Sequence, residues 1–152
     1  MNDRAWYTTF IEQTYFGNVE QGKVDAILAC FLPDAEVVIR HGDSPERLFA
    51  PKASDDRMVL GEFYEHLCGN YEASFRDFRH FVDPDEQRAA SHFKVQLRPK
   101  PDGLYADAGV QNLLNCNFFE FKDELISHMI VYYVNPQAGE GAGSAPTGYP
   151  QG

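Results

Sequence analysis

The segment 14–45 constrains the fold of this 152-residue chain more than any other part of the sequence. Tyr15 lies near the end of a helical pattern, Gly22 marks a turn, and a short apolar helix follows that turn. The run EVVIRH at 36–41 is then expected to form the first strand. The segment therefore predicts two helices followed directly by a strand.

Three helices are expected in the N-terminal half. Asn2 or Asp3 can cap the first, because either side chain offers an oxygen to the free backbone N–H groups of a helix start. The first two helices have apolar residues at helical spacing, namely Trp6, Phe10, Ile11, Tyr15, Val24, Ile27, Leu28 and Phe31. We expect Pro33 to end the second helix, and Gly69-Asn70 to end the third, which spans 59–71.

After the third helix the pattern changes to strands, expected at 74–82, 89–98, 109–121 and 125–134. A hairpin turn is expected at 99–103, since Pro fixes φ and Gly accepts a positive φ. Helices followed by a strand meander predict an α+β fold, with a curved antiparallel sheet wrapped around three N-terminal helices.

Two segments are expected outside this framework. The connection 42–56 is long and rich in Pro, Ser and Asp, so it is a candidate lid over a site. The Gly/Pro-rich residues 136–152 are expected to be a tail without packing of its own. One domain is therefore predicted at 1–135.

Composition and charge exclude several classes of function from what is expected of this chain. The formal net charge is −10 and no Lys/Arg cluster exceeds two residues, so neither nucleic acid nor an anionic membrane is an expected partner. The three cysteines have no CxxC spacing, and no nucleotide, dinucleotide or metal motif is present, so no cofactor and no metal are expected. The N-terminus lacks a signal-peptide pattern, which predicts a cytoplasmic protein.

Aligned without gaps from Tyr15 to Pro45, the chain resembles the nuclear transport factor 2-like superfamily, in particular its ketosteroid-isomerase branch and its polyketide-cyclase (SnoaL-like) relatives. Gly22, the triplet 25–27 (Asp-Ala-Ile) and Phe31 coincide with that pattern, and the triplet 62–64 (Glu-Phe-Tyr) matches a second motif. The resemblance covers roughly 5–135. It implies a cone-shaped, cystatin-like α+β barrel with an apolar pocket for a small ligand.

The resemblance also implies site residues. Tyr15 falls on the family's oxyanion-hole tyrosine, and Tyr64 on the tyrosine that hydrogen-bonds toward it. The family's catalytic aspartate falls on Ile39, which cannot carry a proton, and a positioned general base contributes roughly 10²–10⁴-fold. Steroid isomerisation is therefore not expected. The second oxyanion donor falls on Asn117, whose amide can still donate a hydrogen bond if it points inward.

Strand alternation supplies candidates for the missing base. If it is regular, Ile39 and His41 point into the cone, and so does His128 on the last strand. His128, or His41 at the mouth, would then move a proton. The alternatives are a structural His128 within the core and an exposed loop-edge His41. The expected pocket lining is Trp6, Ile39, Phe93, Val95, Phe119, Ile130 and Tyr132, although aromatics at such spacing also fill cores.

The opposite, convex face of the sheet is also predicted to be apolar. Its expected residues are Val110, Phe118, Met129, Val131 and Tyr133. Apolar residues on both faces predict a second buried surface, and in this superfamily that surface commonly forms a homodimer.

Three functions follow from these patterns. The first is a cofactor-independent enzyme of the isomerase, cyclase or dehydratase kind, acting by general acid–base chemistry on a small apolar carbonyl compound. The second is a non-catalytic binder of an apolar ligand, which the replacement at Ile39 favours. The third is an interaction scaffold or accessory subunit.

Overall fold

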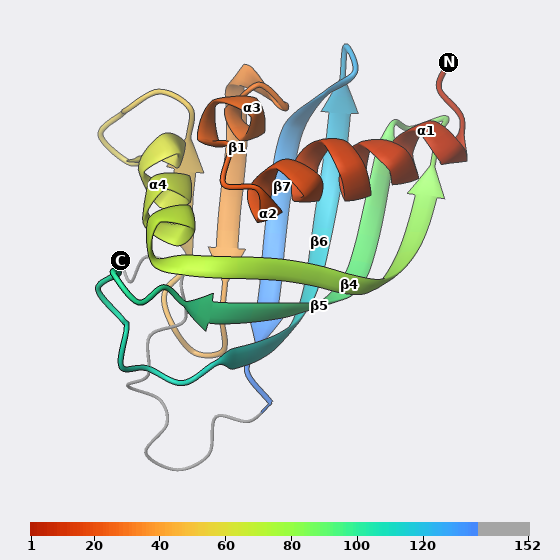
Figure 1. The fold of residues 1–152 in the computed structure, drawn as a ribbon. Coiled ribbons are helices and arrows are strands. Elements are labelled where there is room, and N and C mark those ends of the chain that lie inside the picture. The colour runs from red at the N-terminus through yellow and green to blue at the C-terminus, as the bar shows by residue number, and fades with distance from the viewer. Residues whose placement is uncertain (137–152) are drawn as a thin grey trace.

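One curved sheet and the helices on its inner face make up the described chain (Figure 1). The structure is a computed structural model that describes residues 1–136, so the predicted tail at 137–152 lies outside the described residues. The helices are α1 (Arg4–Thr9), η1 (Phe10–Phe16), α2 (Gly17–Glu20), α3 (Val24–Leu28) and α4 (Leu60–Asn70). The strands are β1 (Phe31–Arg40), β2 (Arg47–Ala50), β3 (Met58–Val59), β4 (Tyr71–Asp83), β5 (Arg88–Pro99), β6 (Gln111–Lys122) and β7 (Leu125–Val134).

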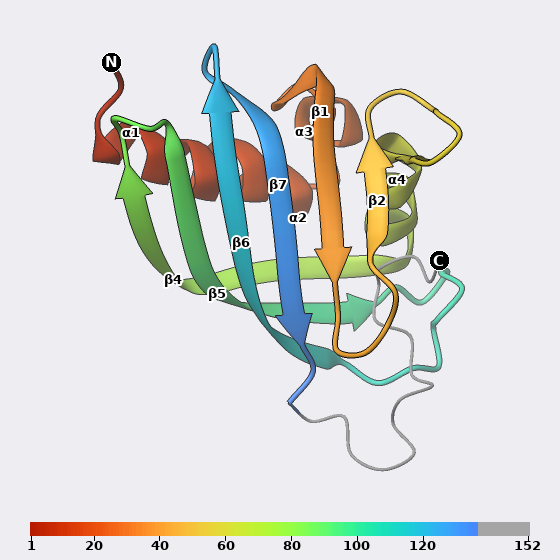
Figure 2. The ribbon, with the colours of Figure 1, turned by 180° about the vertical axis from the view of Figure 1, so that it is seen from behind.

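The strand order is β3-β2-β1-β7-β6-β5-β4. Neighbours are antiparallel except for β1–β7 and β2–β3, which are parallel. The helices cover one face, and the view from behind shows β6, β7 and β1 uncovered on the other (Figure 2). The predicted α+β fold with a curved sheet around N-terminal helices is therefore confirmed.

The first helical region consists of three consecutive segments, α1, η1 and α2. Asp3 caps it, accepting a hydrogen bond from the Trp6 backbone N–H at 2.9 Å. Its middle part, η1, is π-helical, and the Gly17 N–H donates to the carbonyl of Glu12, five residues earlier. Short π-helical stretches are frequent at functional sites. This one carries both Glu12 and Tyr15.

Three boundaries differ from the sequence predictions. The second helix ends at Leu28, because β1 already begins at Phe31 and contains Pro33. The connection 42–56, predicted as a lid, contains β2, and the side chains of Arg47 and Phe49 in β2 are buried. The link between β5 and β6 extends over 100–110 instead of forming a five-residue hairpin turn.

A β-bulge sets the orientation of β7. Phe121 pairs with Ile126, whereas the preceding Glu120 pairs with His128, so β7 has one extra residue at this point. An extra residue reverses the faces of all later side chains. Residues Met129, Val131 and Tyr133 are consequently buried on the inner face, whereas His128, Ile130 and Tyr132 lie on the outer face. The predicted orientation of all six was wrong for this reason.

Aromatic side chains fill much of the space between helices and sheet. Tyr7, Phe93 and Phe119 are among the largest fully buried side chains. Phe16 of the first helix packs on Phe93, with ring centroids 4.7 Å apart. No helix within residues 1–136 is long and apolar enough to cross a membrane.

Candidate functional site

A small cavity lies inside the cone, between the helices and the inner face of the sheet. Its volume is about 20 Å³, measured as the space that the centre of a water molecule can occupy. That is room for about one water. The lining residues are Tyr15, Phe16, Val19, Val37, Ile39, Phe63, Tyr64, Leu67, Phe75, Asn115, Asn117, Met129 and Val131.

Two tyrosine hydroxyls meet in this cavity. The Oη atoms of Tyr15 and Tyr64 are 2.5 Å apart, and both residues are at least 96% buried. Tyr15 comes from the π-helical turn and Tyr64 from α4, so the pair joins the two helices that face the sheet. A buried phenol needs a hydrogen-bond partner. The predicted pair therefore forms in the apolar cone.

Asn117 points into the same cavity, an orientation that the sequence left open. It is 2% exposed. Its Nδ2 lies 3.7 Å from the Met129 sulfur, a weak acceptor. Its Oδ1 has no hydrogen-bond partner. Burying an amide group without a partner is costly, so Asn117 is a polar group available to a ligand in the cavity.

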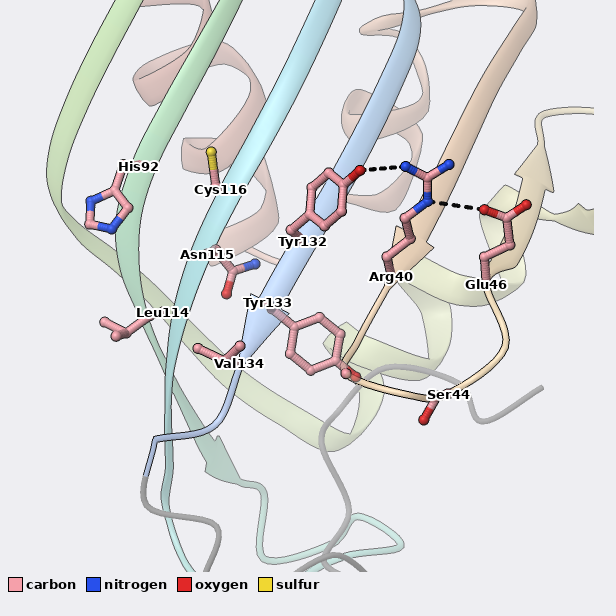
Figure 3. A pocket seen from close by; sticks show the side chains of 11 residues that line it. Arg40, Ser44, Glu46, His92, Leu114, Asn115, Cys116, Tyr132, Tyr133 and Val134 are labelled. Carbon is pink, nitrogen blue, oxygen red and sulfur yellow. Dashed lines mark hydrogen bonds and ion pairs between the residues drawn. The ribbon is translucent and has the colours of Figure 1, made fainter.

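The predicted base His128 does not reach the cavity. It lies on the outer face, where its Nδ1 is 3.1 Å from a carboxylate oxygen of Glu120. Tyr132 also lies outside. Figure 3 shows its hydroxyl meeting the Arg40 guanidinium, which also binds Glu46 at 3.0 Å, beside an outer-face hollow of about 640 Å³.

The other predicted pocket residues have mixed outcomes. Ile39 lines the cavity as predicted. Phe93, Val95 and Phe119 are buried on the inner face but do not line it. Trp6 lies away from the cavity, packed on Tyr7, Phe10 and Phe121. Ile130 lines an outer-face hollow of about 750 Å³ instead. Phe93 and Phe119 follow the alternative interpretation, in which aromatics at regular spacing fill the core.

His41 lies at the end of the cone, just beyond β1. Its ring stacks on that of Tyr133, with centroids 4.2 Å apart. Tyr133 accepts a hydrogen bond of 3.2 Å from Nη2 of Arg47. Burial, followed by the Arg47 charge, lowers the pKa of His41 below its ordinary value. His41 therefore belongs to a cationic corner and does not line the cavity.

A second polar group, missed by the sequence analysis, lies on the strands next to Asn117, and none of its residues lines the cavity. His80 joins Ser91 and Glu12, with Nδ1 2.8 Å from the Ser91 Oγ and Nε2 2.7 Å from a Glu12 carboxylate oxygen. A carboxylate accepts hydrogen bonds, so the tautomer that fits these contacts donates from Nε2 to Glu12 and accepts at Nδ1 from the Ser91 hydroxyl. Simple alternation from Phe75, which lines the cavity, would turn His80 outward, whereas the β4 bulge between Arg76 and Arg79 turns it to the inner face.

Strand pairing places these groups in one row across the inner face. Arg47 pairs with Ile39, Ile39 with Val131, and Val131 with Asn117. Asn117 then pairs with Ser91, and Ser91 with His80. The middle of the row, Ile39 to Asn117, lines the cavity. The row therefore has an apolar centre with a cation at one end and an imidazole at the other.

The described residues form no evident metal centre. Within residues 1–136, no three His, Cys, Asp or Glu side chains are grouped so that they could hold a metal ion.

Comparison with known proteins identifies the fold. No family model and no curated protein matches the sequence. Among solved structures, a putative polyketide cyclase from Silicibacter sp. TM1040 is 23% identical (TM-score 0.62, 88% of this chain and 91% of that one). SalBIII, an epoxide hydrolase/cyclase-like enzyme of salinomycin pyran-ring formation, is 16% identical (TM-score 0.63, 88% and 94%). A cystatin-like protein from Methylobium petroleophilum is 18% identical (TM-score 0.60, 91% and 82%). The chain thus shares the fold of these proteins, one of which is described as cystatin-like, and the predicted cystatin-like α+β fold is confirmed.

Proposed function

We propose that this chain is a small-molecule enzyme of the isomerase or cyclase type, acting on an apolar compound whose carbonyl oxygen binds inside the cone. The observation that carries the proposal is the Tyr15–Tyr64 hydroxyl pair, which faces the same cavity as Asn117, whose Nδ2 donor has only the weak Met129 sulfur as acceptor. Preorganised donors in a dry site stabilise an oxyanion, by about 3 kcal/mol for each donor. Enzymes named as cyclases share the fold, which supports this reaction class.

The proton carrier of this reaction is the Glu12–His80–Ser91 group. His80 lies on the inner face, and Ser91 is fully buried beside Asn117 in the strand ladder. A proton leaving the bound compound moves to the Ser91 Oγ as the Ser91 proton moves to Nδ1 of His80. The resulting imidazolium is held by the Glu12 carboxylate. This arrangement replaces the aspartate that the family would have at Ile39.

Ligand entry requires the cone to open. An apolar cavity of about 150 Å³ binds benzene in another protein, whereas this one holds about 20 Å³. Phe63 and Leu67 of α4 form part of its wall, opposite Val37 and Val131 of the sheet. Movement of α4 away from the sheet enlarges the cavity.

The closed interior also favours a second candidate function, an accessory subunit that presents its outer face to a partner. The exposed apolar side chains Phe81, Phe118, Tyr132 and Val134 lie on that face, along with the two hollows. We propose that a second copy of the chain covers it in either case. Exposed apolar surface of this extent is typical of protein interfaces.

Binding of 2-naphthol, a phenol that mimics an enolate, tests the proposed function. Tyr15→Phe removes one hydroxyl and should weaken binding by more than about 1 kcal/mol, roughly fivefold. The matched control is Tyr7→Phe, which removes another buried hydroxyl that does not line the cavity. Calorimetry should show wild-type affinity for the control. Equal affinity in Tyr15→Phe, or no binding to any of the proteins, would leave the accessory-subunit function.

A further inference from the structure

Arg47 is a buried guanidinium without a carboxylate partner among the described residues. It is 7% exposed, and its Nη1 is inaccessible and makes no hydrogen bond. Its Nη2 donates to the neutral hydroxyl of Tyr133. Moving a charge out of water costs several kcal/mol, and removing the partner of a buried ion is strongly destabilising. Arg47 therefore stands in an energetically unfavourable position in the free protein.

The nearby arginines differ from Arg47. Arg40 binds Glu46 at 3.0 Å, and Arg57 binds Glu36 and Asp56, both at 2.9 Å. The chain has ten more acidic than basic side chains. Carboxylates are thus plentiful, and two of the three arginines between 40 and 57 are paired with them. The missing carboxylate partner of Arg47 is therefore a feature of its own position and not of a general shortage of carboxylates.

The position of Arg47 connects it with the proposed site. It is the register partner of Ile39, and paired residues in antiparallel strands share a face. Ile39, Val131 and Asn117 continue the same row through the cavity. Neighbouring strands are about 4.8 Å apart, so the Cα atoms of Arg47 and Asn117 are separated by roughly 14 Å along the sheet. Arg47 is not among the residues that line the cavity, so a ligand reaches it by extending past Ile39.

We propose that Arg47 binds a carboxylate of the substrate, so that the ligand is an elongated apolar compound with an anionic group at Arg47 and a carbonyl oxygen at Tyr15, Tyr64 and Asn117. This inference rests on the proposed function and adds the substrate class to it. A guanidinium presents parallel N–H donors that match a carboxylate, and Nη1 is free to provide one. The apolar centre of the row accepts the body of the compound.

The binding test compares 2-naphthol with 6-hydroxy-2-naphthoate, which adds a carboxylate to the same ring system. For wild type, we expect the carboxylate to tighten binding at least tenfold. Arg47→Met should abolish this gain while naphthol affinity stays within about twofold. Arg57→Met is the matched control, because Arg57 already has carboxylate partners, and it should keep the gain.

The outcomes separate this inference from the proposed function. Binding of naphthol with no carboxylate gain, or a gain that survives Arg47→Met, overturns the inference and leaves the proposed function intact. If neither compound binds wild type, both fail. If Arg47→Met does not fold, Arg47→Lys replaces it, and its loss of the paired donors should still reduce the gain severalfold.

Measurements of the melting temperature and of the His41 pKa add to the test. If the charge at Arg47 is uncompensated, Arg47→Met raises the melting temperature, as removal of a strained functional group often does. A fall of several degrees would show that the guanidinium is already compensated and would overturn the inference. The pKa of His41, held down by burial and by the Arg47 charge, should rise in Arg47→Met. The His41 pKa should also rise in wild type when the carboxylate of hydroxynaphthoate neutralises the guanidinium. An unchanged His41 pKa both in Arg47→Met and in the wild-type complex would contradict the placement of the carboxylate at Arg47.

Discussion

Ile39→Asp would introduce a carboxylate at the position where the family has its base, directly beside Arg47. Ile39 is 1% exposed, so its replacement loses about 2–5 kcal/mol of packing. Cβ atoms of residues opposite each other in an antiparallel pair are about 5 Å apart, which places the new carboxylate within reach of the guanidinium. The electrostatic gain should therefore offset part of the packing loss.

Four variants isolate that gain. Ile39→Asn has nearly the same shape as Ile39→Asp without the charge, and each is made with Arg47 present and with Arg47→Met. Breaking a buried ion pair by removing one partner costs about 3–5 kcal/mol. We therefore expect the Asp-minus-Asn difference in unfolding free energy to change by about 3 kcal/mol between the two backgrounds at pH 7. With a urea m-value of about 2 kcal/mol/M, this is roughly 1.5 M in the midpoint.

The pH dependence of the stability of Ile39→Asp tests independently whether the interaction of the new carboxylate with Arg47 is favourable. Pairing with Arg47 would lower the pKa of the new carboxyl in the folded state, so the folded protein binds fewer protons than the unfolded one. Its contribution is then fully present above the unfolded value of about 3.9 and is lost as the pH falls through the folded value. A coupling below about 1 kcal/mol at pH 7 would refute the placement of the Arg47 charge on the inner face, and with it the electrostatic basis of the proposed carboxylate site.

Two further predictions concern the proton carrier and the outer face. His80→Gln should lower the turnover of any carbonyl substrate found by about 10²-fold or more, while His128→Gln, on the outer face, should leave it unchanged; similar kinetics in both variants would exclude His80. Phe118, which is 44% exposed on the outer face, should hold a dimer together, so sedimentation should show a dimeric wild type and a monomeric Phe118→Glu; a monomeric wild type would contradict the proposed dimer.

The sequence predicted the helical side of the site better than the strand side. Tyr15 and Tyr64 were found through the family resemblance, whose two motifs fall on helices, and local spacing determines which way a helical residue faces. Their hydrogen bond followed from the need of a buried phenol for a partner. The facing of a helical residue depends on neighbours within about one turn and not on pairing with a distant strand.

The strand residues depended on pairing, which one sequence does not show. Simple alternation from the buried Ile126 leads to an inward His128, and the bulge between Ile126 and His128 overturns it. The apolar run that follows has hydrophobic residues on both faces, so its pattern could not reveal the error. His80 was lost in the same way at the bulge in β4. Arg47 was missed because the loop composition of 42–56 hid a strand of four residues.

The polar side chains that the core retains support a ligand site over a purely structural interior. Arg47, Ser91 and Asn117 are all buried on the inner face, and a core of apolar residues at these positions would avoid their desolvation. In an interior with a cavity of about 20 Å³, hydration by bulk water does not compensate them. An unpaired amide oxygen and an unpaired guanidinium nitrogen in one strand row, with Ile39 and Val131 between them, have opposite hydrogen-bonding needs. In its enol form the proposed compound donates its hydroxyl to the Asn117 oxygen and places its anion at Arg47, which satisfies both, whereas closer packing of the protein alone satisfies neither.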